Sequence, residues 1–386
     1  MTRRLLSALT LLAAALILGA CSLSGGKSRS AQTTASRPPQ PIATPSPTAK
    51  ALVTTTSATT PPANPALRAT PKPTSTPAPK PSARIVTAAG CCGLFAWVDD
   101  SQLLVLDAPG GRAQTSIYDL TNGNRKQLGG DFGTSAAGLV ALSDQASGTT
   151  RIVDQNGRTV STIQNQGTET WIAPNGKRVA WLQPLPSKTP SSLLPRPVEL
   201  WVADINGANA KPVLRLLASN VQWLADSRHL VTVGRTLAAQ SPGVWDIDSD
   251  TGSHQVIVPA TFVQALQVSP DGAHLAYLIT FSGKPAQDGI WVSNADGTGR
   301  RHISGQGGFR WADGGSRLWL LQLAPDGGGN DHLQLIDTAS DATVTTVALD
   351  GRVLDDRWSI SPDGRYVAFW RETDQQTEVF GPLPGA

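Results

Sequence analysis

Acidic side chains are missing from the first quarter of the chain. No Asp or Glu occurs before Asp99, whereas residues 22–84 contain eight Lys and Arg residues. The remainder holds all 29 acidic residues against about 22 basic ones, so it is net acidic by about seven charges. The pI of 8.8 therefore reflects an N-terminal segment. It does not predict nucleic-acid binding, which would need a basic patch on a folded surface.

Local motifs of catalysis and metal binding are also missing. The chain has no GxSxG motif of the serine hydrolases and no HxH or HExxH pair among its five His residues. The glycine run at 326–331 lacks the Lys and the helix of a phosphate-binding loop. The Asp box of sialidases places one residue between Asp and Gly, but Asp363 and Gly364 are adjacent. We therefore expect no cofactor and no metal.

The first residues, MTRRLLSALTLLAAALILGAC, have the pattern of a secretion signal. Arg3 and Arg4 precede an apolar run, Leu5 to Ala20, that is shorter than the ~20 residues of a spanning helix. The run ends in LGAC, which resembles a bacterial lipobox, and this resemblance implies that Cys21 is acylated. We predict a lipoprotein signal peptide at 1–21 and an extracytoplasmic protein held to the cell membrane by lipid. An ordinary signal peptide or an anchor helix is the alternative.

Residues 22–84 predict a disordered linker. Ser, Thr, Ala and Pro dominate the segment, as in ATPKPTSTPAPKPSA at 69–83. Such a composition buries too little apolar area to offset the entropy of ordering, and Pro favours extended geometry. The basic residues could contact anionic lipid or wall polymer, or could simply keep a spacer hydrated.

One short motif recurs along the rest of the chain. It reads APNGKRVAWL at 173–182, SPDGAHLAYL at 269–278 and SPDGRYVAFW at 361–370. Weaker copies begin at residues 95, 223 and 311, and a degenerate copy covers 138–145. Turn residues flanked by alternating apolar residues are typical of a β-hairpin.

Further strands follow each hairpin, such as LWVADING at 200–207 and KPVLRL at 211–216. Four strands per unit at a period of about 33 to 50 residues predict the blades of a β-propeller. We therefore expect an all-β domain, a single β-propeller over residues 85–386 with seven blades. Six or eight blades are the alternatives, because the second blade lacks the turn signature in its first strands.

The SPDG units followed by LWVADING or IWVSNADGTGRR resemble TolB-type repeats, which are relatives of the WD-type propeller repeats. The resemblance extends over nearly all of residues 85–386 and implies the fold. Propellers include enzymes, scaffolds and receptors, so it implies little about function. The TolB family has an additional N-terminal α/β domain, for which this chain has no room.

Residues at repeated positions are expected to serve the blades. Asp and Asn of the turns occupy equivalent places in several units, namely Asn175, Asp226, Asp271, Asp313 and Asp363. His229 and His274 share another equivalent place, a solvated edge rather than a metal site. The stretch Asp246–Gly252, DIDSDTG, resembles the start of a calcium loop but has Thr251 where that loop needs Gly. We predict turns at the Asp and Asn positions and at Asp246–Gly252, and a solvated edge at the two histidines.

Two other features are candidates for function. Cys91 and Cys92 could form a strained, redox-sensitive disulfide between neighbours, or could be two small buried residues. Residues 183–198 form the longest connection, stiffened by Pro, with Leu193, Leu194 and Arg196 as a possible binding loop.

The two ends of the propeller are expected to meet in one blade. After residue 370 only one more strand remains, so the last blade lacks its outermost strand. We predict that Arg84–Thr87 pairs beside Thr377–Phe380 and supplies it. The favoured function is a monomeric, non-catalytic module that binds a protein or an envelope polymer. The alternative is an enzyme or small-ligand receptor that uses the central channel.

Overall fold

The computed structural model describes residues 82–385, apart from residues 91, 109–112, 130–131, 187–196, 219, 240, 260–261, 304, 306, 313 and 326–327. The regular secondary structure of the described residues consists of β-strands and one short 3-10 turn, η2 (Pro285–Gln287). Within these residues, no helix has the length and apolar character needed to cross a bilayer. The predicted signal peptide, Cys21 and residues 22–81 of the predicted linker lie outside the described residues.

The strands form antiparallel groups of four, which we name blades 1 to 7 in chain order. Blade 1 contains β2 (Phe95–Trp97), β3 (Gln102–Asp107), β4 (Gln114–Asp119) and β5 (Arg125–Gln127). Blade 2 contains β6 (Gly133–Ala136), β7 (Leu139–Asp144), β8 (Thr149–Asp154) and β9 (Thr159–Gln164). Blade 3 contains β10 (Thr170–Ile172), β11 (Arg178–Pro184), β12 (Pro197–Asp204) and β13 (Lys211–Ala218).

Blade 4 contains β14 (Gln222–Trp223), β15 (His229–Thr236), β16 (Gly243–Asp248) and β17 (His254–Val258). Blade 5 contains β18 (Val263–Val268), β19 (His274–Ile279), β20 (Gly289–Asn294) and β21 (Arg301–Ile303). Blade 6 contains β22 (Phe309–Trp311), β23 (Arg317–Gln322), β24 (His332–Asp337) and β25 (Ala342–Ala348). Blade 7 contains β26 (Val353–Ile360), β27 (Val367–Arg371), β28 (Thr377–Gly381) and the N-terminal β1 (Ser82–Ile85).

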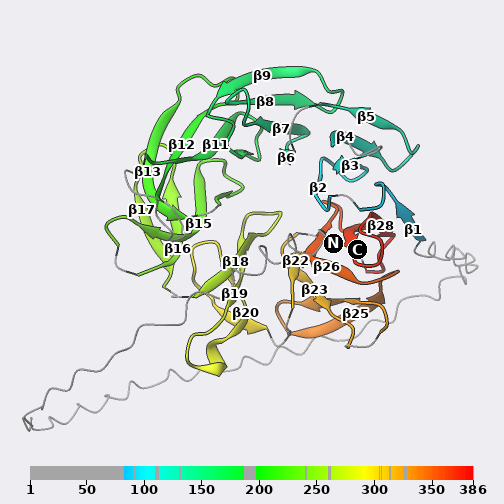
Figure 1. The fold of residues 1–386 in the computed structure, drawn as a ribbon. Helices are drawn as coiled ribbons and strands as arrows, with labels where there is room; N and C mark the ends of the chain where they lie inside the picture. Colours follow the sequence, from blue (N-terminus) through cyan, green and yellow to red (C-terminus); the bar gives the residue numbers. More distant parts are fainter. Residues whose placement is uncertain are drawn as a thin grey trace, which may run out of the picture. The chain divides into compact units, whose positions relative to one another are not determined.

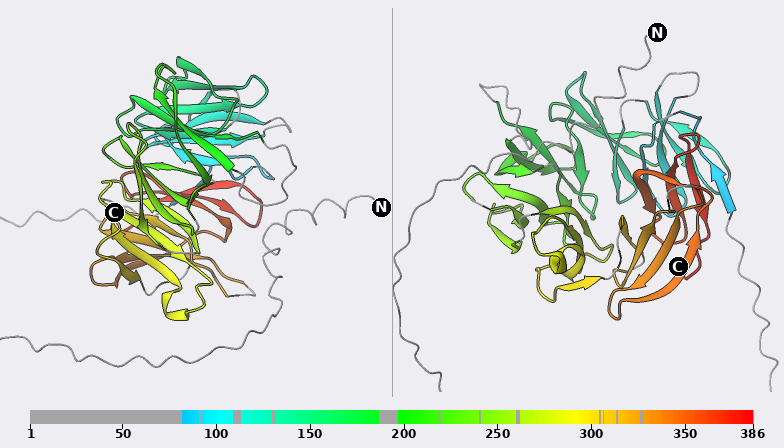
Figure 2. Two further views of the ribbon diagram at one scale, coloured as in Figure 1. Left: turned by 90° about the vertical axis from the view of Figure 1, so that its left-hand side faces the viewer. Right: turned by 60° about the horizontal axis from the view of Figure 1, so that its bottom comes forward.

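Blades 3 and 4 form one continuous sheet, because three residues of β13 pair with β15. With that sheet divided at the β13–β15 pairing, the described strands make seven four-stranded groups, the number that the repeats predict. Figure 1 shows the groups following one another in chain order, so that β28, drawn in red, lies beside β1, drawn in blue, with which it pairs. Figure 2 shows the same succession of sheets from two further directions.

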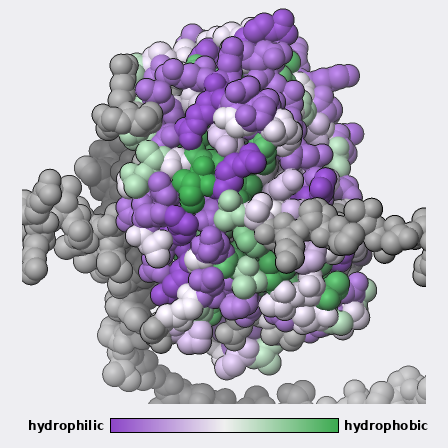
Figure 3. All heavy atoms as spheres, turned by 90° about the vertical axis from the view of Figure 1, so that its right-hand side faces the viewer, coloured by the Kyte–Doolittle hydropathy of each residue, from purple (hydrophilic) through white to green (hydrophobic). Residues whose placement is uncertain are grey.

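Burial explains why the second strand of each blade is the most apolar. β3, β11 and β23 are nearly continuous buried runs, because a neighbouring blade covers each of their two faces. The outermost strands β5, β9 and β25 are largely exposed. Figure 3 shows one flank of the domain, where a hydrophobic patch is surrounded by mostly hydrophilic side chains.

Each junction between neighbouring blades has its own hydrophobic cluster. Trp181 of blade 3 packs with Ile152 of blade 2, and Trp319 of blade 6 packs in a cluster with Trp358 of blade 7. Indole groups of the first strands also bond across the junctions. Trp223 Nε1 donates to the Trp171 carbonyl at 3.0 Å, and Trp311 Nε1 donates to the Gln267 carbonyl at 3.2 Å. The large Trp content of the sequence therefore serves the contacts between blades.

The two ends of the domain meet in blade 7, with the pairing predicted from the sequence. β1 runs antiparallel to β28, with Arg84 opposite Val379. Beyond the strand, Val86 N–H donates to the Thr377 carbonyl at 2.9 Å, and Thr377 N–H donates to the Thr87 hydroxyl at 2.7 Å. Arg84 also donates to the Leu120 carbonyl, so β1 fastens blade 7 to blade 1.

Candidate functional site

The repeated turn carboxylates serve the turns, as predicted. Asp226, Asp271 and Asp363 each accept a hydrogen bond from the backbone N–H two residues later, at 2.9 to 3.0 Å. Asn175 does the same at 2.9 Å, whereas Asp313 lies outside the described residues. Such local acceptors stabilise a turn and are the reason that Asp and Asn recur there.

His229 and His274 also share one environment. Each imidazole Nδ1 faces the turn carboxylate three residues earlier, at 2.5 Å from Asp226 and 3.8 Å from Asp271. The hydrogen bond to Asp226 raises the pKa of His229. Within the described residues, no group of three or more His, Cys, Asp and Glu side chains could hold a metal ion.

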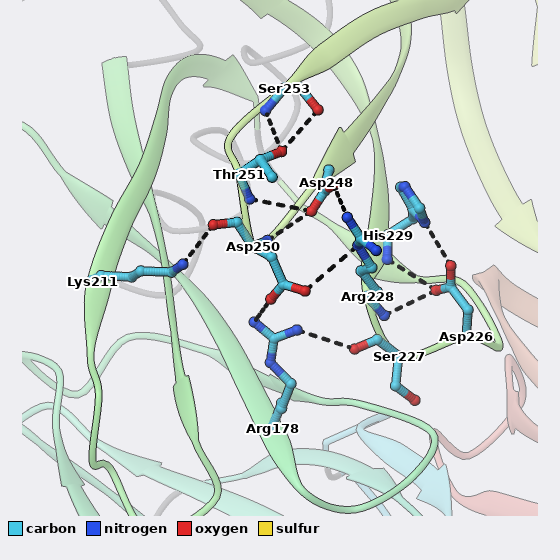
Figure 4. Close-up of polar contacts among 10 residues, drawn as sticks. All are labelled: Arg178, Lys211, Asp226, Ser227, Arg228, His229, Asp248, Asp250, Thr251 and Ser253. Carbon is cyan, nitrogen blue, oxygen red and sulfur yellow. Dashed lines mark hydrogen bonds and ion pairs between the residues drawn. The ribbon is translucent and has the colours of Figure 1, made fainter.

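In the stretch that resembles a calcium loop, two carboxylates pair with arginine side chains. Figure 4 shows this charge network at the junction of blades 3 and 4. Arg228 approaches Asp248 at 2.6 Å, and Arg178 of the neighbouring blade approaches Asp250 at 2.9 Å. The hydrogen bond from Arg228 holds the pKa of Asp248 well below its ordinary value. Lys211 Nζ donates to the Asp250 carbonyl at 2.7 Å, so the network joins two blades.

The innermost strands carry a second set of charges, between blades 6 and 7. The Arg310 guanidinium of β22 lies 4.7 Å from the centre of the Trp358 ring. Its Nε donates to the Trp358 carbonyl at 2.9 Å, and its Nη2 lies 3.6 Å from Asp356. This cation is therefore used to join β22 to β26.

A pocket of about 280 Å³ lies between blades 4 and 5, and we call it the inter-blade pocket. Its apolar walls come from the end of β17, the start of β18 and the end of β19, at Val258, Pro259, Phe262 and Ile279. Ser282 and Gln287, from the loop between β19 and β20, add polar groups. The pocket is therefore built from two neighbouring blades and one loop.

Trp291 of β20 lines the inter-blade pocket and is fixed from two sides. Its Nε1 donates to the Gln287 carbonyl at 3.0 Å, and the His302 ring meets it edge-on at 5.2 Å between centres. His302 Nε2 in turn contacts the Asp288 carbonyl at 3.0 Å. A side chain held in this way loses little rotamer freedom when a ligand packs on it.

The loop from Thr280 to Asp288 is also held internally. Asp288 Oδ1 accepts a hydrogen bond from Ser282 N–H at 2.9 Å, and the Ser282 hydroxyl donates to the Lys284 carbonyl at 2.9 Å. The side chain of Ser282, and then its N–H group, lower the pKa of Asp288. Phe281 has a φ of 54° and is 80% exposed. A bulky residue with positive φ is strained, and such strain often marks a functional loop. Phe262 lies beside this loop, because the Thr280 N–H group donates to the Phe262 carbonyl. The side chain of Phe262 is 42% exposed.

A second, more open groove of about 470 Å³ runs along β13 and the end of β15. Its charged residues are engaged with each other, since Arg215 Nε donates to Glu199 at 3.0 Å. Glu199 also accepts from Trp201 Nε1 at 3.0 Å. The inter-blade pocket is therefore the better candidate for binding.

Cys92 is disulfide-bonded and half-buried. Its carbonyl accepts from Arg357 Nη1 at 3.0 Å, and that guanidinium lies 4.7 Å from the centre of the Trp370 ring. For Cys92, the disulfide bond contradicts the alternative prediction of a small buried residue with a free thiol. The other two cysteines, Cys21 and Cys91, lie outside the described residues, as do Leu193, Leu194 and Arg196 of the predicted binding loop.

Comparison with known proteins supports the fold. No protein family matches the chain, and no curated protein matches it. An oligogalacturonate lyase in complex with manganese is similar in structure, with a TM-score of 0.57 and 13% identity over 75% of this chain and 88% of its own. The oligogalacturonate lyase of Vibrio parahaemolyticus has a TM-score of 0.57 and 11% identity, over 78% of this chain and 94% of its own.

TolB from Acinetobacter baumannii also matches, with a TM-score of 0.40 and 12% identity over 74% of this chain and 78% of its own. The fold itself is a β-propeller, built from four-stranded antiparallel sheets. At these identities the similarity establishes the fold alone, and residue roles do not carry over.

The residues of the inter-blade pocket were not predicted from the sequence. They come from four separate segments of blades 4 and 5, which become neighbours only in the fold. One signal was present: the connection from Thr280 to Asp288 contains Phe281 and Pro285 and is longer than the turns around it. Long connections that carry apolar residues are candidates for binding loops.

Proposed function

We propose that the chain is an extracytoplasmic, lipid-anchored binding module that captures a protein partner at the inter-blade pocket. The single observation that carries this proposal is a preformed pocket with a fixed Trp291 and two exposed aromatic side chains, Phe262 and Phe281, beside it. Exposed aromatic residues around a rigid pocket are typical of hot spots in protein interfaces.

Topology adds a second reason. The loop that bears Phe281 joins the second and third strands of blade 5, and residues 185–196 join the second and third strands of blade 3. In successive blades of the same connectivity these loops lie at the same end of the strands. A partner bound at the pocket would therefore approach the end of the propeller to which the predicted binding loop is attached.

The proposed location rests on the sequence. Arg3, Arg4 and the apolar run before Cys21 supply the signal, and residues 22–84 supply a spacer between membrane and propeller. An envelope polymer in place of a protein is the other partner class.

An enzyme or small-ligand receptor that uses the central channel is the alternative function. The lyase structures share the fold, but fold does not determine chemistry. One lyase structure contains manganese. Among the described residues of this chain, no three His, Cys, Asp or Glu side chains lie close enough together to bind such a metal ion. The charged pair Arg310–Asp356 of the innermost strands is engaged with Trp358.

Capture from detergent-solubilised membranes tests the binding function. The full chain, a Phe262→Ser/Trp291→Leu variant and a Val160→Ser control are used as baits, and Val160 is an exposed apolar residue of blade 2. We expect the pocket variant to lose its specific partner by at least about tenfold, because hot-spot residues carry more than about 1.4 kcal/mol. Deletion of residues 186–196 should weaken the same capture. Equal enrichment by all baits with unchanged melting curves would contradict the proposal.

A further inference from the structure

The volume and walls of the inter-blade pocket limit what it can hold. Its size, about 280 Å³, exceeds the roughly 150 Å³ cavity that accepts benzene in an engineered protein, so one ring and a small substituent fit. Val258, Pro259, Phe262 and Ile279 offer no hydrogen bonds from their side chains. A group that enters between these walls must be apolar, because a polar group there would lose its water without replacement.

Among the described residues that line the pocket, Arg300 is the cationic one. Arg300 is exposed and lines the pocket, but its position is fixed. Nη2 donates to the Ile257 carbonyl at 2.7 Å and Nε donates to the Gly297 carbonyl at 3.0 Å. Its Nη1 has no hydrogen-bond acceptor among the described residues. The guanidinium therefore presents a positive charge and a donor group to the pocket with little freedom to move away.

A buried hydroxyl provides a second polar contact. Tyr277 lines the pocket and is fully buried. Within the described structure, its hydroxyl group has no hydrogen-bond partner. Burial raises the pKa of this phenol, while the charge of Arg300 and the nearby Ser293 hydroxyl oppose that effect. Unsatisfied buried hydroxyl groups are uncommon, and a ligand oxygen would satisfy this one.

Trp291 completes the recognition surface. Its indole N–H is already bonded to Gln287, so the ring offers a face for packing and no donor for a ligand hydroxyl. A sugar ring would therefore leave several of its hydroxyl groups without partners against the aliphatic walls. An aromatic or similar apolar ring would pack on Trp291 without that loss.

We infer that the inter-blade pocket binds an apolar, ring-sized group with a carboxylate beside it, such as an aromatic residue at the carboxyl end of a partner's chain. The ring lies between Trp291 and the aliphatic wall, and the carboxylate pairs with Arg300 and meets the Tyr277 hydroxyl. This inference rests on the proposed binding function, whose partner it describes.

The test uses N-acetyl-L-phenylalanine and its amide as probes of the full chain labelled with 5-fluorotryptophan. The ¹⁹F resonance of Trp291 is assigned from its loss in a Trp291→Phe variant. We expect the acid to shift this resonance with a Kd of about 1 mM, which corresponds to the ordinary binding efficiency of a drug-sized ligand. The amide should bind about tenfold more weakly, because it loses the charge-assisted bond to Arg300.

Two arginine variants separate charge from packing. Arg300→Gln should remove the difference between acid and amide, and Arg300→Lys should keep part of it. Arg301→Gln is the matched control, since Arg301 is exposed and donates to the Ala339 carbonyl of blade 6. Its affinities for both probes should equal those of the unaltered chain.

Three results would overturn the inference: equal binding of acid and amide, no shift by the acid at about 10 mM, or tighter binding of D-glucuronate than of the acid. If the acid fails while Phe262→Ser/Trp291→Leu still loses the captured partner, the binding function stands and only the ligand class is wrong. If the capture assay fails as well, both proposals are wrong.

Discussion

Single carboxylates in this protein have two very different roles. Some are acceptors in turns, such as the half-buried Asp119 and the exposed Asp296, whose pKa values are lowered by hydrogen bonds from their own turns. Glu378 of β28 is the opposite case, because it is completely buried. Arg371 Nη1 donates to one of its oxygens at 2.9 Å, and the other oxygen has no partner within the described structure. Burial raises its pKa to about 7, although Arg371 opposes the shift.

This pKa predicts that the carboxyl of Glu378 makes the fold less stable as the pH rises. In the unfolded chain the group loses its proton near its ordinary value of 4.5, whereas the folded chain keeps the proton up to about pH 7. The contribution of Glu378 to the free energy of unfolding is therefore fully present below pH 4.5, and it is lost as the pH rises to about 7. The loss is about 3 kcal/mol if no other group compensates.

Glu378→Gln should consequently stabilise the domain at about pH 8 by about 2 kcal/mol and leave it unchanged near about pH 4. Urea unfolding at the two pH values measures the difference. Glu372→Gln is the control, because Glu372 is a largely exposed partner of Arg352 and should matter little at either pH. A Glu378→Gln variant that is less stable than the unaltered chain at the higher pH would show that the ionised pair with Arg371 stabilises the fold instead.

At the scale of elements, the short strand β1 completes blade 7. It has only four residues, all exposed, yet it covers the edge of β28 and is followed by the fully buried Val86. An uncovered β28 would leave a row of backbone groups unpaired. Blade 7 is therefore complete only when both ends of the domain are present.

Deletion of residues 82–88 should lower the melting temperature by about 10 °C, since several hydrogen bonds and the burial of Val86 are lost together. Differential scanning calorimetry measures the change. Deletion of residues 25–80 is the comparison and should leave the melting temperature unchanged. Similar melting temperatures for the two deletions would contradict the closure by β1.

Elements could be predicted from the sequence wherever a local pattern repeats. The hairpins at 171–182 and 360–370, their Asn and Asp turns, and the pairing of β1 could all be predicted, from residues near one another in the chain or from an edge that must be covered. The inter-blade pocket and the burial of Glu378 could not be predicted from the sequence. Both depend on which side chains pack around a residue in the folded protein, and the sequence of one strand does not specify those neighbours.

At the scale of the whole molecule, the blades are joined by contacts of the same kind at every junction. Each junction has a hydrophobic cluster, and the junction of blades 7 and 1 is no exception, since Ala368 and Val379 pack with Leu103 and Val105. Arg178 and Asp250 join blades 3 and 4 with charge. The propeller is therefore a single unit that a tether would carry as one body.

Attachment of that unit to the membrane is predicted to depend on one atom, the sulfur of Cys21. Cys21→Ala should move the chain from the membrane fraction to the soluble extracytoplasmic fraction and abolish incorporation of labelled palmitate, because no acyl chain can then be attached. Arg29→Ala, within the tether, is the control and should change neither. Retention of the Cys21→Ala chain in the membrane fraction would favour an anchor helix.

The pairing of β1 with β28 has a mechanical consequence for a tethered protein. Tension from the N-terminal side would reach the propeller at Ser82, which lies opposite Gly381. A pull along the strand would load all the β1–β28 bonds together in shear, whereas a pull across it would peel them open one after another. β1 would be the first strand to give way, while the other six blades, each paired within itself, would remain intact. The strand that closes the propeller is thus also the joint that would limit the force it can bear.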